Sequence, residues 1–131
     1  MPPMPARAVA AYQEVQVTSR SPLELVVMLY DGALVALEQA RAALAAGDLV
    51  AKRDAMSRSL AILGQLQGSL NLDAGGDVAA RLDGLYTYLT ARLTTANMTG
   101  DPAPVAEAIR LLSVVREGWT GITSPPLKAA V

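Results

Sequence analysis

The sequence predicts an all-α protein, an antiparallel up-down-up-down four-helix bundle with a short N-terminal helix. Apolar residues recur at every third or fourth position along four long segments, and no segment shows the alternation of a strand. Short loops separate the segments, which favours antiparallel neighbours. The length of 131 residues suits one domain with one core.

Proline, glycine and capping residues predict the boundaries of these parts. Residues 1–20 form a flexible N-terminal segment with a short capping helix, residues 21–120 form the helical bundle, and residues 121–131 form a flexible C-terminal tail. Ser21, Pro22 and Glu24 are typical of a helix start, because the serine caps, the proline fits the first turn and the glutamate completes a capping box. This first long helix ends at Gly47.

The same signals predict the remaining elements. A helix runs from the capping residue Asp48 to Leu70, and a turn follows over residues 71–76, where the pair Gly75-Gly76 breaks any helix. The next helix covers residues 77–96, with Asn97 as a left-handed cap. The last helix starts at Asp101-Pro102 and runs to Trp119. Trp119 is expected to fill the core. Arg116 is expected to point to solvent, with a position over the Trp119 indole as the alternative.

The composition argues against an enzyme. The chain contains no histidine and no cysteine, so it lacks the commonest general acid–base group, the commonest transition-metal ligand and any thiol nucleophile. The Gly75-Gly76 pair lacks the preceding strand and the lysine of a phosphate-binding loop. We therefore expect no catalytic residues, no cofactor and no metal.

Charge and hydropathy restrict the partners and the location. The net charge is −1 and the basic residues are scattered, so no nucleic-acid surface is expected. No apolar run reaches the roughly 18–20 residues that a membrane span requires, and the first residues do not form a secretory signal. The predicted location is the cytoplasm, without membrane insertion.

The first long helix carries more apolar surface than one core face requires. Glu24, Asp31 and Glu38 are seven residues apart and therefore share one narrow solvent line. Burying a large apolar group is worth roughly 1.5–3 kcal/mol, so several such groups beside this line need a cover. Those on one side are Leu23, Val27, Tyr30 and Leu34, and those on the other side are Met28 and Val35.

Three covers are consistent with this pattern. The N-terminal segment around Tyr12 could shield the surface, a partner chain could bind it, or a second copy could form a homodimer. The first two are compatible, because a weakly held segment can open to a partner. Tyr88 and Asn71 are further candidate contacts. Alternatively, Tyr88 is a partly buried structural tyrosine and Asn71 ends a helix.

Three blocks of sequence then point to one family. They are AYQEVQVTSRSPLELVVMLYDGAL at residues 11–34, SLN followed by GGDVA at residues 69–79, and LYTYL, AN and LLSVVREGW between residues 85 and 119. Through these blocks, the chain resembles the FliS family of flagellar export chaperones that serve flagellin. The complete absence of phenylalanine departs from the usual composition of that family.

The resemblance implies a four-helix bundle that binds the disordered C-terminal segment of flagellin in the cytoplasm, prevents premature polymerisation and supports export by the flagellar type III apparatus. It also implies contacts with the export apparatus and with other flagellar regulatory proteins, and a cap near Tyr12 that shifts on binding. The alternative is a helical-bundle homodimer or an adaptor that docks a regulatory protein, without an export role. The expected client-binding residues are Tyr12, Leu23, Val27, Tyr30, Leu34, Asn71 and Tyr88.

Overall fold

The computed structural model describes residues 21–120 and 128–131. Within these ranges the chain forms four long helices and no strand, which confirms the all-α class: α2 (Pro22–Ala46), α3 (Leu49–Gly68), α4 (Leu72–Thr99) and α5 (Ala103–Thr120). None of these helices is both long enough and apolar enough to cross a membrane. The short helix predicted near the N-terminus, and Tyr12 with it, lies outside the described residues.

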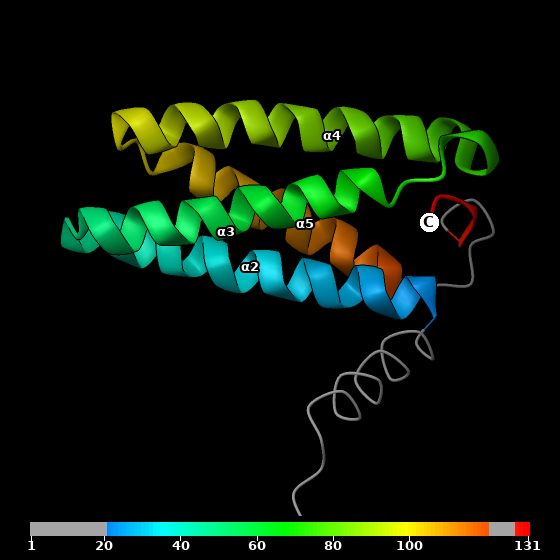
Figure 1. The fold of residues 1–131 in the computed structure, drawn as a ribbon, viewed down its shortest axis with the longest axis horizontal. Coiled ribbons are helices and arrows are strands. Elements are labelled where there is room, and N and C mark those ends of the chain that lie inside the picture. Colours follow the sequence, from blue (N-terminus) through cyan, green and yellow to red (C-terminus); the bar gives the residue numbers. More distant parts are fainter. Residues whose placement is uncertain (1–20, 121–127) are drawn as a thin grey trace, which may run out of the picture.

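The four helices lie side by side along the long axis of the molecule (Figure 1). α2 packs against α3 and α5, and α4 packs against the same two helices. All four therefore enclose one core, and the fold is a four-helix bundle. Figure 1 also shows that the start of α2, the connection from α3 to α4 and the segment 128–131 lie at the same end of this bundle.

Local capping determines both ends of α2 and the start of α3, as predicted. Ser21 Oγ accepts a hydrogen bond of 3.1 Å from the backbone N–H of Glu24. Gly47 closes α2 with φ 69°, a left-handed conformation that glycine adopts without the steric penalty of a side chain. Asp48 then caps α3, because its Oδ1 accepts a hydrogen bond of 3.1 Å from the N–H of Ala51.

The start of α4 differs from the predicted turn over residues 71–76. The helix begins at Leu72, and Asn71 caps it by accepting a hydrogen bond of 3.0 Å from the N–H of Ala74. Only Gly76 leaves helical geometry, with φ 52° and ψ −130°. The glycine pair therefore kinks the helix at Gly76, but residues 72–75 before the kink are already helical. Asn71 begins this helix instead of ending the previous one.

The far end of α4 also differs from prediction. Asn97 does not adopt the expected left-handed conformation; the helix continues to Thr99, and Gly100 closes it with φ 76°. Glycine takes this conformation at a lower cost than asparagine does. The start of α5 agrees with prediction, because Asp101 Oδ1 accepts a hydrogen bond of 3.0 Å from the N–H of Ala103.

The core consists mainly of leucine and alanine side chains around three aromatic residues. Trp119, Tyr30 and Tyr86 are the largest fully buried side chains, so Trp119 fills the core as predicted. Burial of side chains of this size contributes about 1.5–3 kcal/mol each. The small residues of α2 that face inward allow its neighbours to approach closely; those that are buried are Ala33, Ala36, Ala40 and Ala43.

The last described residues are docked on the bundle, in contrast to the tail predicted for residues 121–131. Ala130 is fully buried, and its carbonyl oxygen accepts a hydrogen bond of 2.9 Å from the N–H of Asn71. Residues 121–127 lie outside the described part of the chain. Sequence periodicity does not reveal this docking, because the segment is too short to show a repeat and its contacts are distant along the chain.

Candidate partner-binding surface

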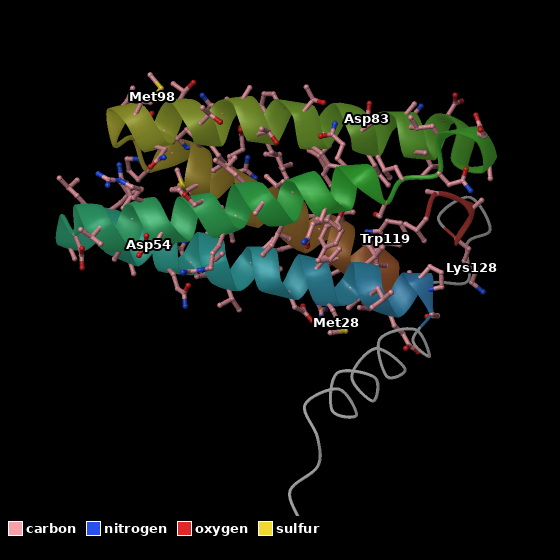
Figure 2. All side chains as sticks on the ribbon, viewed as in Figure 1. Met28, Asp54, Asp83, Met98, Trp119 and Lys128 are labelled. Carbon is pink, nitrogen blue, oxygen red and sulfur yellow. The ribbon has the colours of Figure 1, made fainter. Side chains whose placement is uncertain are left out.

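The outward face of α2 carries apolar side chains on both sides of an acidic line. Glu24, Asp31 and Glu38 are exposed along this line, as predicted. Met28 points away from the bundle in Figure 2 and is 48% exposed, and Val35 is 58% exposed. The apolar residues on the other side are partly buried and pack against the edge of the core; they are Leu23, Val27 and Leu34.

A shallow hollow between α2 and α3 borders this face and is lined by residues that include Asp31, Val35, Arg58 and Ile62. Three more follow the face along α2. The first lies on α2 itself and is lined by Leu34, Val35, Glu38, Gln39 and Ala42. The second lies where α2 meets the end of α5 and is lined by Leu23, Glu24, Val27, Trp119 and Thr120. The third is lined by Ser21, Pro22, Leu23, Lys128 and Val131. The second and the third hollows adjoin at Leu23, which borders both, and we call the two together the Leu23 groove.

Tyr30 does not lie on this surface, although the sequence places it there. Its side chain is 0% exposed, and its hydroxyl oxygen lies 2.5 Å from that of Tyr86, across the bundle on α4. Tyr30 is seven residues from the fully buried Leu37, so the two point in nearly the same direction from α2. Since α3 and α5 both pack against α2, the buried arc of that helix is wide enough to include this direction.

The buried aromatic residues have perturbed acidity. Burial raises the pKa of Tyr30, while hydrogen bonding to Tyr86 and the proximity of the Trp119 indole act in the opposite direction. Burial also raises the pKa of Tyr86, and its charge and hydrogen-bond interactions with Tyr30 raise it further. Within the described residues the Trp119 indole N–H makes no hydrogen bond of normal geometry, although the rings of Trp119 and Tyr30 are 6.3 Å apart. The cluster is therefore neutral and structural at ordinary pH.

An ion pair links α5 to α2 beside the apolar face. The guanidinium of Arg116 donates from Nε to Asp31 Oδ1 and from Nη2 to Asp31 Oδ2, the second at 3.2 Å. Its hydrogen bond with Asp31 raises the pKa of Arg116. Arg116 therefore lies at the surface, as expected, but it is paired with Asp31. Exposed ion pairs contribute little to stability, so α5 is held against α2 mainly by the packing of the two helices.

Two other predicted contacts lie away from the α2 surface. Tyr88 is on α4, is 45% exposed and donates a hydrogen bond of 2.7 Å to Glu107 Oε1 on α5. This bond raises the pKa of Tyr88 and lowers that of Glu107. Asn71 is exposed at the start of α4, where it serves as a helix cap. The structure thus brings Leu23, Val27 and Leu34 to one helix face, but not Tyr88 or Asn71.

The sequence analysis did not assign several residues that line the same hollows. These are Gln39 and Ala42 on α2, Thr120 at the end of α5, and Lys128 and Val131. A helical wheel of α2 includes the first two at the far end of the same face. No pattern in the sequence indicates the last two. The described residues contain no group of three or more acidic side chains arranged to hold a metal ion.

Comparison with known proteins identifies the family. The family model described as "Flagellar protein FliS" matches residues 5–126. This chain belongs to the FliS family. The resemblance that the three sequence blocks indicate is therefore confirmed, and FliS is a family of chaperones.

FliS proteins from several bacteria are similar over nearly the whole length. The flagellar secretion chaperone FliS of Salmonella typhimurium is 39% identical over 123 residues, which cover 90% of this chain and 91% of the relative. The flagellar secretion chaperone FliSB of Pseudomonas aeruginosa is 36% identical over 121 residues, with 89% and 96% covered. The FliS of Escherichia coli is 30% identical over 128 residues, with 93% and 94% covered.

Proposed function

We propose that this chain is a cytoplasmic chaperone for flagellin. Its up-down-up-down bundle, with antiparallel neighbours, binds the disordered C-terminal region of flagellin, prevents premature polymerisation and supports export by the flagellar type III apparatus. It requires no cofactor, catalyses no reaction and binds neither nucleic acid nor membrane. Further partners are the export apparatus and other flagellar regulatory proteins. Membership of the FliS family supports this proposal.

The observation that carries the proposal is the apolar outward face of α2. Large apolar groups remain on the wet side of this helix after the core is complete, with Val35 58% exposed and Leu34 only partly buried. Such a face suits an amphipathic helix that lays its apolar side into a groove. The exposed acids of α2 run between the two apolar sides of this face, so a partner would meet apolar and charged groups together.

The energetics favour a client that contacts a large part of this surface. Ordering a disordered segment costs about 2–5 kcal/mol or more of the gross interaction energy. One hollow gives too little apolar contact to offset that cost. The hollow around Val35 and the Leu23 groove lie along the same helix and together offer a longer track. We therefore expect an extended complex with a stoichiometry of one to one.

The direct test is titration calorimetry with a C-terminal flagellin fragment. The wild-type protein should bind one fragment, and the complex should show more helical circular dichroism than the sum of its parts. Val35→Asp should weaken binding by at least about tenfold, or 1.4 kcal/mol, because it places a charge in the lining of the first hollow. Val35 is a cleaner site than Leu34, whose packing against the core would mix loss of stability with loss of binding.

A matched control uses a valine of similar exposure on another helix. Val50, on the first turn of α3, is 67% exposed, so Val50→Asp introduces the same side chain away from the proposed face. It should change the affinity less than twofold, which is about 0.4 kcal/mol in binding free energy. Equal weakening by both variants, or by neither, would contradict the assignment of the face. A stable dimer in light scattering that ignores the fragment would instead favour a homodimer or adaptor without an export role.

A further inference from the structure

Residues 128–131 fill a socket at the end of the bundle where α2 begins and α3 connects to α4. Figure 2 shows Lys128 at this end, and Figure 1 shows the segment folded against it. Ala130 is fully buried, whereas Lys128 is exposed. Val131 is partly buried and packs against the core cluster. The segment is therefore held by its last two residues.

A glycine makes the room for Ala130. A Cβ atom at Gly75 would lie 2.7 Å from the Cα and 3.2 Å from the Cβ of Ala130, and the first of these distances is too short for two carbon atoms that are not bonded. Gly75 itself is buried in α4. The socket thus accepts a small side chain because a hydrogen atom takes the place of a side chain in its wall.

A backbone donor provides the second element of recognition. The first N–H groups of a helix have no acceptor within the helix, and the N–H of the capping residue lies outside it. The N–H of Asn71 donates to the carbonyl oxygen of Ala130 at 2.9 Å, while the side chain of Asn71 is already engaged with Ala74. The socket thus requires a small side chain beside Gly75 and a backbone carbonyl opposite the N–H of Asn71. Any peptide that places alanine, serine or glycine in the socket can supply both.

The socket adjoins the surface assigned to the client. Val131 and Lys128 line one end of the Leu23 groove, and Leu23 connects that end to Val27 and Trp119. The docked segment therefore forms one side of the hollow at this end of α2, and its release would open that side to an incoming helix or extended chain.

We infer that the segment 128–131 is an internal occupant of a peptide-binding socket at the end of the Leu23 groove, and that a client segment displaces it. This inference rests on the proposed function. The apparent affinity of a site that is only partly open is reduced by the open fraction. The docked state rests on one backbone hydrogen bond, the buried methyl group of Ala130 and the partly buried side chain of Val131, which are modest contributions. Release of the segment should therefore tighten client binding about three- to tenfold.

The first test compares Ala130→Glu with the wild-type protein. Ala130→Glu places a carboxylate where the socket admits only a methyl group, and should release the segment without altering the bundle. In calorimetry with the C-terminal flagellin fragment, Ala130→Glu should bind about three- to tenfold more tightly than the wild-type protein. Val50→Glu introduces the same side chain at an exposed position of α3, away from the groove, and should bind as the wild-type protein does.

The second test reports displacement in the otherwise unaltered protein. Because the chain has no cysteine, Ala130→Cys creates a single thiol whose reaction with a soluble thiol reagent depends on its exposure. It should react slowly in the free protein and faster when the flagellin fragment is added. Lys128→Cys should react at a high rate in both states.

The outcomes separate this inference from the proposed function. If wild-type protein binds the fragment but Ala130→Glu shows no gain, or binds more weakly, the segment does not compete with the client and the inference alone is overturned. Unchanged protection of Ala130→Cys in the complex has the same meaning. If wild-type protein does not bind the fragment at all, the proposed function fails and this inference fails with it.

Discussion

Replacing Tyr30 by phenylalanine should destabilise the bundle, because the change leaves the hydroxyl of Tyr86 buried without its partner. The two hydroxyl oxygens are 2.5 Å apart, and both side chains are at most 1% exposed. The aromatic ring is retained, so the variant loses the hydrogen bond without creating a large cavity. A buried polar group that loses its partner costs about 1–3 kcal/mol, and we expect a loss in this range for Tyr30→Phe.

The double variant distinguishes a hydrogen bond from a packing effect. Tyr30→Phe with Tyr86→Phe removes both polar groups, which can be nearly neutral when the shape is kept. Its loss of unfolding free energy should therefore be smaller than the sum of the two single losses by about 1–3 kcal/mol. Tyr86→Phe alone should cost less than Tyr30→Phe, since the Tyr30 hydroxyl can turn toward the nearby indole of Trp119.

Urea denaturation measures these free energies with two probes. Helical circular dichroism reports the whole bundle, and fluorescence of Trp119, the single tryptophan, reports the core next to Tyr30. Tyr88→Phe is the control, because Tyr88 is an exposed tyrosine with a surface hydrogen bond and its change should be nearly neutral. Additive losses in the double variant, or no loss in either single variant, would refute the reasoning.

Three further predictions concern the whole chain. The folded pKa values of the two buried tyrosines lie above the unfolded value of 10.0, so the unfolded state loses these protons first as the pH rises. The free energy of unfolding should therefore fall above pH 10.0, by up to about 1.4 kcal/mol per pH unit for each tyrosine. Urea denaturation below and above this pH measures the change. Gly47→Ala should lower the melting temperature and cost about 1–2 kcal/mol of stability, because residue 47 has a left-handed backbone with φ 69°. Gly64→Ala should raise the melting temperature and add about 0.5–1 kcal/mol of stability, because residue 64 lies within α3 and nothing lies near an added Cβ atom. Asp31→Asn should slightly lower the melting temperature at low salt by weakening the pair with Arg116, and this difference should disappear at high salt; a difference independent of salt would contradict the ion-pair interpretation.

The surface of α2 was predicted in large part from sequence, with one residue misplaced. The acidic line and the positions of Val27 and Leu34 beside it follow from the period of the helix. Tyr30 lies at the border between the two faces, and a wheel drawn for one isolated helix does not show how wide the buried arc is. That width depends on two neighbouring helices packing against α2.

The amino-acid sequence by itself determined the order of four long helices, the caps at Ser21, Asp48 and Asp101, and the family. These depend on residues within about one or two turns of each other or on motifs read in order. Tertiary structure alone decided that Arg116 pairs with Asp31, that Tyr30 bonds to Tyr86, and that the segment 128–131 enters a socket beside Gly75. Each of these contacts joins residues more than fifty positions apart. Which distant side chains meet depends on how the helices pack against one another, and no local period contains that information.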